Sequence, residues 1–300
     1  MKPLLMALPE NDDFANSLCQ RLDVDQGELL VRQFPDEETY VRLLSPVEGR
    51  RVILVCTLDR PDSKLTALLF AAATARELGA MEVGLVAPYL CYMRQDARFR
   101  DGEAITARCF PQWISAHFDW LVTVDPHLHR IDRLDAVYGC ATHVVRAAPA
   151  IADWIRSHVK APIIIGPDME SEQWVAAIAA LAGVPYTTLH KTRRGDREVE
   201  VSVPDENMLA GRTPVLIDDI VSTAGTMAAA LAHLRRMDAA PGVCIAVHPI
   251  LADGALDLLE TSGARIFISC NSVIHPSNHI DLSPAIAAAL TDKLDYPSRP

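Results

Sequence analysis

The fold is decided by the stretch Val215-Leu216-Ile217-Asp218-Asp219-Ile220-Val221-Ser222-Thr223-Ala224-Gly225-Thr226-Met227. An apolar run of strand length leads into two acids, and the alanine-rich stretch 227–234 after the loop is typical of a helix. A loop between a strand and a helix lies at the carboxyl end of the strand, where open α/β sheets bind their ligands. The stretch therefore predicts an α/β fold with a ligand site at this loop.

The loop contains the groups that a phosphate dianion requires. Its small and hydroxyl-bearing residues are Ser222, Thr223, Ala224, Gly225 and Thr226. The hydroxyls can donate to phosphate oxygens, the two small residues let the backbone approach a ligand, and the N–H groups at the helix start attract an anion. The simpler interpretation is a strand-to-helix turn with an Asp or Ser cap, which the two adjacent acids and the S-T-A-G-T run disfavour.

The two acids before the loop are expected to have different roles. Successive strand residues point to opposite faces of a sheet, so Asp218 and Asp219 are not expected to share one task. We expect one of them to contact ribose hydroxyls or a metal ion and the other to support the loop.

Length and composition indicate two domains of ordinary size. The 300 residues are 50% hydrophobic, which is enough for two cores. A formal net charge of −11 argues against a nucleic-acid or membrane partner, because such surfaces require clustered Lys and Arg. The first residues are too short an apolar run for a signal peptide, and no run reaches membrane-spanning length, so we expect a cytoplasmic protein.

A strand, loop, helix and strand occur twice, which indicates two copies of one α/β unit. The first copy is expected at 52–58, 64–78 and 81–89, and the second at 214–218, 227–237 and 242–250. Further strands are expected at 120–124, 163–165 and 265–269, with helices at 104–116, 150–159, 172–181 and 255–259. Such alternation predicts two domains, residues 1–143 and 144–300, with mainly parallel sheets flanked by helices.

The phosphate loop resembles the ribose-5-phosphate loop of phosphoribosyltransferases and, more closely, that of phosphoribosyl pyrophosphate (PRPP) synthetases, also called ribose-phosphate pyrophosphokinases. Six further segments match the PRPP synthetase pattern in chain order, from near residue 34 to the last of them at 271–284. This order makes the resemblance specific. It implies two tandem phosphoribosyltransferase-like domains, with the ATP site on the side of the first and the ribose 5-phosphate loop in the second.

The resemblance implies an adenine site in the segment Phe-Pro-Asp-Glu-Glu-Thr-Tyr-Val that starts at Phe34. In the family pattern F-x-D-G-E-x-Y-V, the ring and the two acids hold the adenine of ATP across a subunit interface. By this match the binding residues are Phe34, Asp36 and Glu38, and Glu37 stands where the family commonly has glycine. Taken alone, the segment is typical of an acidic hairpin turn.

A second ATP segment is the run Tyr-Met-Arg-Gln-Asp at 92–96, which resembles the family's Y-x-R-Q-D. In that pattern the Arg and the Gln contact ATP, which implies this role for Arg94 and Gln95. The guanidinium is a planar fork of donors for phosphate oxygens, and the amide can bond either base or phosphate.

Two residues are implied to act at the magnesium ion of MgATP. His127 lies in Val-Asp-Pro-His-Leu-His, which resembles V-D-x-H, and Asp168 lies in Gly-Pro-Asp, which resembles S-P-D. Magnesium prefers oxygen ligands, so the histidine is expected to act weakly, through water or on phosphate. His127 and His129 also have the spacing of a zinc pair, although no third ligand is nearby in sequence. Residues 169–172 depart from the family by adding bulk and negative charge.

The catalytic residues implied by the resemblance are Lys191 and Arg193, in the run Lys-Thr-Arg-Arg-Gly-Asp-Arg. The family has a K-x-R pair on a flexible loop that closes over the reacting phosphates. A solvated turn is the simpler interpretation of a charge run. Cations delivered to a phosphoryl transition state can accelerate transfer by about 10³ to 10⁵.

The function implied by the resemblance is that of a ribose-phosphate diphosphokinase, which transfers pyrophosphate from MgATP to the 1-hydroxyl of ribose 5-phosphate and releases AMP. The shared adenine pocket implies a homodimer or a larger assembly. Three alternatives stay open: a type I phosphoribosyltransferase, which the two ATP segments fit poorly, a pyrophosphokinase acting on another pentose phosphate, and a non-catalytic regulatory subunit.

Overall fold

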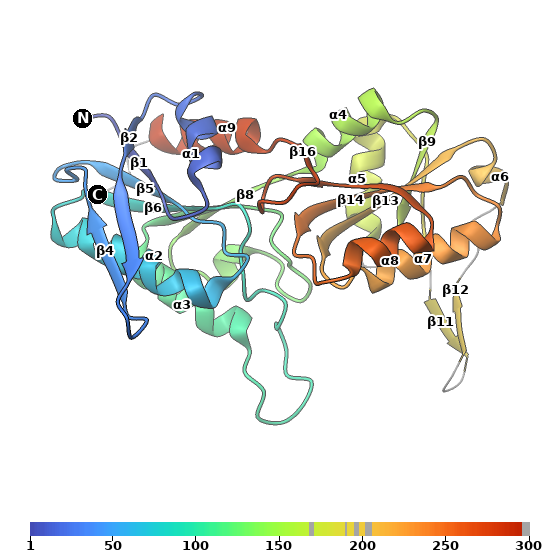
Figure 1. Ribbon diagram of the computed structural model, residues 1–300, viewed down its shortest axis with the longest axis horizontal. Helices are drawn as coiled ribbons and strands as arrows, with labels where there is room; N and C mark the ends of the chain where they lie inside the picture. The colour runs from blue at the N-terminus through green and yellow to red at the C-terminus, as the bar shows by residue number, and fades with distance from the viewer. Residues whose placement is uncertain (168–170, 190, 195–197, 202–205, 296–300) are drawn as a thin grey trace. The chain divides into compact units, whose positions relative to one another are not determined.

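Runs of Val, Ile and Leu form the central strands of two parallel sheets, one in each half of the chain (Figure 1). The computed structural model describes residues 1–167, 171–189, 191–194, 198–201 and 206–295. The chain divides into two compact units, one made of Met1–Arg146 and the segment from Ser283 onward, the other of Ala147–Leu282. The predicted fold class, two α/β domains with mainly parallel sheets flanked by helices, is confirmed.

The sheet of the first unit has the strand order β2-β1-β5-β6-β7-β8, and every neighbouring pair is parallel. In that order the strands are Asp25–Gly27, Leu4–Ala7, Arg51–Val55, Glu82–Ala87, Trp120–Val124 and Ala141–Val145. β6 and β7 are buried along their whole length, as expected for parallel strands covered on both faces. Because these two strands are parallel neighbours, the loops that follow them leave the sheet at the same edge.

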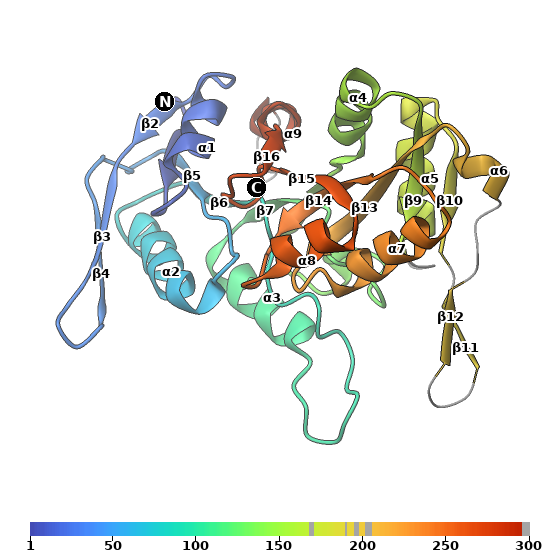
Figure 2. The ribbon, with the colours of Figure 1, turned by 45° about the vertical axis from the view of Figure 1, so that its right-hand side comes forward.

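Helices cover both faces of this sheet (Figures 1 and 2). α1 (Asp12–Cys19) and α9 (Ser283–Asp295) lie on one face, and α2 (Pro61–Glu77) and α3 (Thr106–His117) lie on the other. A short 3-10 helix, Leu134–Ala136, follows β7. The antiparallel hairpin of β3 (Leu29–Gln33) and β4 (Thr39–Leu43) forms a separate sheet, with β4 packed near α2.

Helix α9 packs against β7 and β8 although some 140 residues of sequence lie between them. Ile286 and Leu290 on this helix have no exposed surface, and the guanidinium of Arg51 donates a hydrogen bond to the carbonyl of Leu294 at 2.8 Å. The sequence predicts a second domain at 144–300. The structure differs, because the apolar face of α9 covers the first sheet and so this helix belongs to the first unit.

The sheet of the second unit has the order β10-β9-β13-β14-β15-β16, again with parallel neighbours. In that order the strands are Tyr186–Thr188, Pro162–Gly166, Thr213–Val221, Gly242–Pro249, Ala264–Cys270 and Asn278–Ile280. α4 (Ala148–His158) and α5 (Glu172–Ala182) cover one face, and α7 (Gly225–Arg236) and α8 (Ala255–Ser262) cover the other (Figure 1). The remaining described elements are the hairpin of β11 (Lys191–Arg194) and β12 (Glu198–Val201) and the short helix α6 (Glu206–Leu209).

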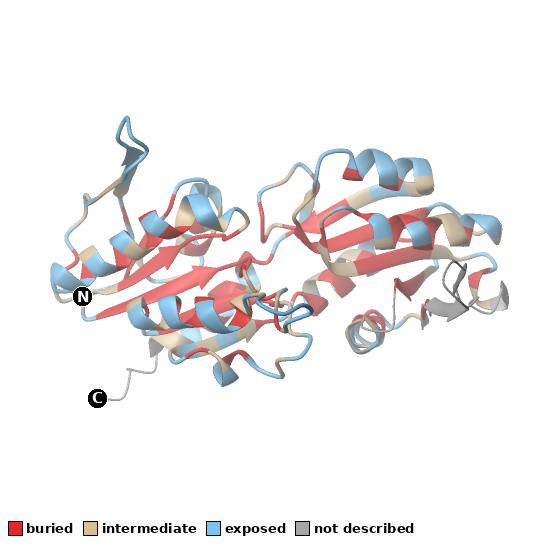
Figure 3. Cartoon of the chain, turned by 90° about the horizontal axis from the view of Figure 1, so that it is seen from below, coloured by how far each residue is buried: buried red, intermediate tan, exposed pale blue. Residues whose placement is uncertain are grey.

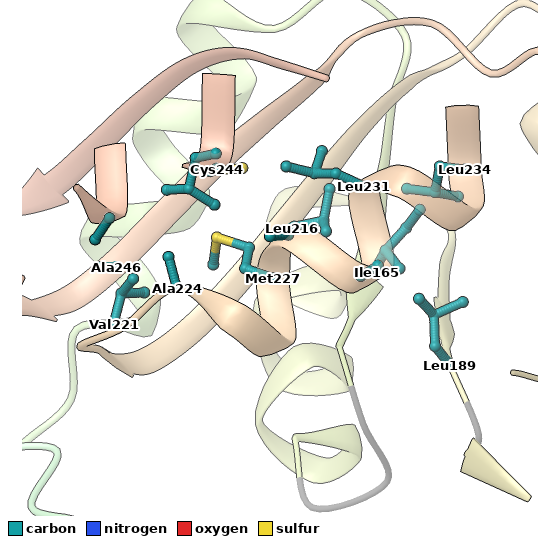
Figure 4. Close-up of a cluster of buried hydrophobic side chains, with 14 of the residues drawn as sticks. Ile165, Leu189, Leu216, Val221, Ala224, Met227, Leu231, Leu234, Cys244 and Ala246 are labelled. Carbon is teal, nitrogen blue, oxygen red and sulfur yellow. The ribbon is translucent and has the colours of Figure 1, made fainter. Parts of the chain in front are cut away.

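Burial follows the layers of each unit (Figure 3): the sheet strands are mostly buried and the helices expose their outer faces. In the second unit a cluster of apolar side chains packs between α7 and the sheet (Figure 4). Residues of this cluster are Ile165, Leu189, Leu216, Val221, Ala224, Met227, Leu231, Leu234, Cys244 and Ala246. The core therefore anchors both the strand before the predicted phosphate loop and the helix after it.

Within the described ranges, none of the helices combines the length and the apolar character needed to cross a bilayer.

Candidate functional site

Strand β13 places the two predicted acids near the carboxyl edge of the second sheet. The sequence predicts a strand that ends at Asp218 and Asp219, whereas β13 continues to Val221 and both acids lie half-buried inside it. The Oδ1 atom of Asp218 accepts a hydrogen bond from the N–H of Asp219 at 3.0 Å. The Oδ1 atom of Asp219 accepts one from the N–H of Ile220 at 2.7 Å. These local bonds orient the two carboxylates along the strand.

The predicted phosphate loop runs from Ser222 directly into α7. Ala224 is the N-cap residue and has the left-handed conformation, with φ 61° and ψ 5°, and no side-chain cap hydrogen bond is made at this position. For an L-residue the left-handed conformation costs roughly 1–2 kcal/mol. The methyl group of Ala224 is only 6% exposed and packs in the core cluster, which holds the residue in this conformation (Figure 4). The first amides of α7 thus start without a side-chain cap, the arrangement that suits a bound anion.

Gly225 is the first residue of α7, and the protein itself gives no steric reason for a glycine there. Among the described residues, a Cβ atom added here would have one neighbour within 4 Å, the Oγ1 atom of Thr223 at 3.7 Å, which is an ordinary contact. Glycine lowers helix stability by about 1 kcal/mol relative to alanine in a helix interior. Open space above an uncapped helix start is consistent with a ligand that approaches the backbone closely.

The predicted adenine segment forms the turn of the β3–β4 hairpin. The N–H of Phe34 donates to the carbonyl of Glu38 at 2.8 Å, and the Oδ1 atom of Asp36 accepts from the N–H of Glu38 at 3.4 Å. The ring of Phe34 is 40% exposed. The guanidinium of Arg32 lies 4.5 Å from this ring and 4.2 Å from the ring of Tyr40. The hairpin therefore presents a partly exposed aromatic ring that is held by Arg32 and Tyr40.

Glu37 has the backbone conformation that a glycine adopts most easily. Its φ is 69°, and its N–H donates to the carbonyl of Phe34 at 2.9 Å. The departure from the family's glycine therefore leaves the left-handed turn in place, at a cost in backbone energy. Positive φ also occurs at Tyr92 and Asp125, so several of the strained non-glycine residues belong to predicted site segments.

We expect Glu37→Gly to raise the free energy of unfolding by up to about 1 kcal/mol, because relief of the left-handed strain exceeds the entropy cost of glycine. Urea unfolding followed by circular dichroism would measure the change. Glu37→Ala is the matched control, since it removes the same side chain and keeps the strain, and it should give no such gain. A glycine variant less stable than the alanine variant would contradict the prediction.

The second predicted ATP segment follows β6 and is fixed on both sides of Arg94 and Gln95. The hydroxyl of Tyr92 donates to the Oδ1 atom of Asp62, at the start of α2. The carbonyl of Tyr92 accepts from the Oγ1 atom of Thr106 at 3.1 Å, and the carbonyl of Gln95 accepts from a backbone N–H of α3 at 3.2 Å. Arg94 is exposed and Gln95 half-buried, so the two predicted binding side chains lie at the surface of a fixed loop.

His127 follows β7, the parallel neighbour of β6, so it leaves the sheet at the edge where Arg94 and Gln95 lie. Asp125, two residues before it, has φ 29°, accepts from the guanidinium of Arg146 at 3.1 Å, and donates its N–H to the carbonyl of Val145 at the end of β8 at 3.0 Å. The rings of His127 and His129 are stacked with centroids 6.4 Å apart. Among the described residues no group of three or more His, Cys, Asp or Glu is arranged to hold a metal ion.

The predicted catalytic residues occupy alternate positions of β11, where Lys191 is paired with Val201 and Arg193 with Val199 of β12. They follow β10, whose neighbour β9 lies beside β13. The carboxyl ends of these strands share one edge of the second sheet. Asp168, two residues after the end of β9, lies outside the described residues.

The comparisons with known proteins agree over nearly the full chain. Residues 4–117 match the N-terminal domain of ribose phosphate pyrophosphokinase, and residues 141–285 match the phosphoribosyl transferase domain. A ribose-phosphate pyrophosphokinase of Methanopyrus kandleri is 31% identical over 96% of this chain and 98% of its own length. That of Saccharolobus solfataricus is 33% identical over 91% of this chain and 95% of its own.

The chain belongs to the ribose-phosphate pyrophosphokinase family. A crystal structure of phosphoribosylpyrophosphate synthetase from Mycobacterium smegmatis covers 98% of this chain and 99% of its own, with a TM-score of 0.84 and 26% identity. The predicted family and its phosphoribosyltransferase-like fold are confirmed, and with them the expectation of an enzyme. Glu37 and Ala224, which both have the left-handed backbone conformation, lie in segments that carry the resemblance to this family.

Sequence reasoning assigned no role to Asp96, whose side chain is 3% exposed. It accepts hydrogen bonds from the N–H and the guanidinium of Arg130, at 3.0 and 2.9 Å. Burial alone would raise the pKa of the Asp96 carboxyl, but the bonds from Arg130 outweigh it and hold this pKa below its usual range. The sequence signal for this residue was the acid at the end of the Arg-Gln-Asp run. Its partner, Arg130, is 34 residues away, so no local pattern connects the two.

A carboxyl whose pKa is lower in the folded than in the unfolded chain stabilises the fold above the unfolded value of about 3.9 and loses this contribution as the pH falls through the folded value. We therefore expect part of the wild-type loss of stability between about pH 5 and about pH 3 to be absent from Asp96→Asn. Urea unfolding at a series of pH values would measure both curves. Parallel curves would show that Asp96 contributes nothing to acid sensitivity.

Proposed function

We propose that the protein transfers pyrophosphate from MgATP to the 1-hydroxyl of ribose 5-phosphate, giving PRPP and AMP. The observation that carries the proposal is the uncapped start of α7 with open space at Gly225, directly after the two acids of β13. A sugar phosphate matches both parts, because its phosphate needs donors and its hydroxyls need acceptors. Membership of the ribose-phosphate pyrophosphokinase family supports ATP as the proposed donor.

Ribose 5-phosphate would bind at the carboxyl edge of the second sheet. Its phosphate would accept from the first amides of α7 and from the hydroxyls of Ser222, Thr223 and Thr226. Asp218 or Asp219 would accept from the ribose hydroxyls, and one of them would instead support the loop. Fixing the 5-phosphate and the ribose ring would aim the 1-hydroxyl at the β-phosphorus, which converts the transfer into a reaction between aligned groups.

ATP would bind through residues of the first unit. The exposed ring of Phe34 offers a face for the adenine, with Asp36 and Glu38 as acceptors for its amine. Arg94 offers a fork of donors for phosphate oxygens, and Gln95 a further amide. The magnesium ion would enter with ATP and neutralise phosphate charge, with His127 and Asp168 as its proposed protein contacts.

Lys191 and Arg193 would act in the transfer itself. In the transition state negative charge develops on the phosphate oxygens, and two cations placed beside it would stabilise that state more than the ground state. We further propose a homodimer or larger assembly, because the family shares its adenine pocket between subunits, and a cytoplasmic location.

A different pentose phosphate acceptor is the second candidate function. The observation that favours it is in the sequence, where residues 169–172 add bulk and negative charge directly after Asp168. The left-handed turn retained at Glu37 argues against loss of the adenine site and so against a non-catalytic subunit.

Phosphorus NMR of the purified protein with magnesium, ATP and ribose 5-phosphate tests the proposal. We expect AMP and the paired pyrophosphoryl signals of PRPP, only when the sugar is present. The run without sugar is the control for ATP hydrolysis. No product signals with ribose 5-phosphate, together with turnover of another pentose phosphate, would establish the second candidate. No product signals with any acceptor tested, together with retained ATP binding, would contradict a catalytic function.

A further inference from the structure

The loop that carries Arg94 and Gln95 is held by side chains that bind no substrate in the proposed mechanism. At its start the hydroxyl of Tyr92 donates to Asp62, so the beginning of α2 holds one side of the loop. At its end Asp96 is buried and accepts two hydrogen bonds from Arg130. The two ATP-binding side chains therefore lie between two fixed points, one on α2 and one after β7.

Arg130 also contacts an aromatic ring. Its guanidinium lies 5.4 Å from the centre of the Phe99 ring, so it contacts an aromatic face as well as a carboxylate. The Nδ1 atom of the neighbouring His129 lies 4.0 Å from the Oδ2 atom of Asp96. The buried carboxylate of Asp96 thus contacts His129 and Arg130, two consecutive residues that follow His127 in the chain.

Nothing local requires this pairing. Asp96 follows β6 and Arg130 follows β7, and each loop could end at the sheet edge without a bond to the other. A neighbouring ion pair shows the contrast: Arg133 and Asp135 are two residues apart and largely exposed, with side-chain exposures of 76% and 48%. An exposed local pair contributes little, whereas a buried carboxylate with directional donors fixes the geometry of both loops.

We propose that Asp96 and Arg130 are positioning residues that hold the loop of Arg94 and Gln95 at a fixed distance from His127, so that the polyphosphate of ATP meets both at once. The proposal rests on the proposed function of these three residues. Asp96 and Arg130 would not touch the substrate. They would act by keeping two separate loops in one arrangement, where a displacement of about 1 Å can cost on the order of 100-fold in rate.

The test is a double-mutant cycle of Asp96→Asn and Arg130→Gln in the full-length protein, read out as the Kd and KM for ATP, the KM for ribose 5-phosphate, and kcat. We expect each single variant to raise the Kd and KM for ATP about tenfold or more and to lower kcat, with the KM for ribose 5-phosphate within about twofold of wild type. The double variant should change the Kd for ATP no more than the more affected single variant does, because both substitutions remove the same Asp96–Arg130 hydrogen bonds. Arg133→Gln is the matched control and should leave the Kd for ATP, both KM values and kcat unchanged.

Hydrogen exchange separates this proposal from a general loss of stability. In both single variants the backbone around Tyr92 to Asp96 and around His127 to Arg130 should exchange faster, while the central strands of the sheet keep their protection. Additive effects on ATP binding, or equal effects on the two substrates, would overturn the proposal. If wild type binds ATP and makes no PRPP, the proposed reaction fails while the ATP Kd of the variants still decides the positioning role. If wild type binds no ATP, both fail.

Discussion

Replacing Lys191 with alanine is expected to lower kcat by roughly 10³-fold or more, judging from the effect of arginine fingers in other phosphoryl-transfer enzymes. The affinity for ribose 5-phosphate should stay within about twofold of wild type, because the proposed ribose site is the β13–α7 loop and lacks this cation. Steady-state kinetics and equilibrium binding of the sugar phosphate would measure the two effects separately.

The control for this prediction is Lys160→Ala, which removes an exposed lysine of the same unit, after α4. It should leave kcat unchanged. Arg193→Lys gives a second comparison, since it keeps the positive charge of the proposed partner residue and removes its planar fork of donors. An alanine variant at 191 with normal turnover would exclude the proposed catalytic role.

Replacing Gly225 with alanine is expected to weaken the binding of ribose 5-phosphate about tenfold or more, which corresponds to about 1.4 kcal/mol or more. The added methyl group would enter the open space above the helix start, where the protein leaves room and the proposed phosphate approaches the amides. The free energy of unfolding should stay the same or rise slightly, because alanine favours a helix over glycine. Isothermal titration with the sugar phosphate and urea unfolding would give both values.

Gly139→Ala is the matched control for this change. Gly139 lies in the other unit, and within the described part of the chain a Cβ there would meet the Ser115 side chain alone, at 3.5 Å or more. It should leave sugar-phosphate binding unchanged. Unchanged binding in the Gly225 variant would mean that the phosphate does not approach this helix start, and loss of stability would mean that the glycine serves the fold.

The central strands and the helices between them were largely predictable, because strands such as β6, β7 and β9 are apolar runs bounded by turn residues. Strand β7 is found at the predicted residues, and α4 and α5 begin and end within two residues of their predicted bounds. The exception with the largest consequence is α9, for which no helix was predicted and whose residues were assigned to the second domain. A helical pattern shows which face of a helix is apolar, but it does not show which of two sheets that face covers.

The candidate site was predictable as a set of motifs and less so as a geometry. The order of the motifs located the loops that follow β6, β7 and β13, since ligand-binding loops follow parallel strands. The extension of β13 beyond Asp219 was missed, because a polar residue at a strand end resembles the start of a loop. The pairing of Asp96 with Arg130 was missed because hydrogen bonds between residues 34 positions apart leave no local pattern. Lys191 and Arg193 stay predictions in their roles.

The return of α9 to the first unit has a consequence for biosynthesis. Residues 147–282 form one uninterrupted segment, so this unit can complete its own fold once that segment has left the ribosome. The first unit has a different order of events: its sheet is translated early, yet the helix that buries Ile286 and Leu290 against it is translated after the whole of the second unit. During that interval the apolar surface beneath α9 lacks its cover, and a chain truncated before residue 283 would have a first unit without this helix.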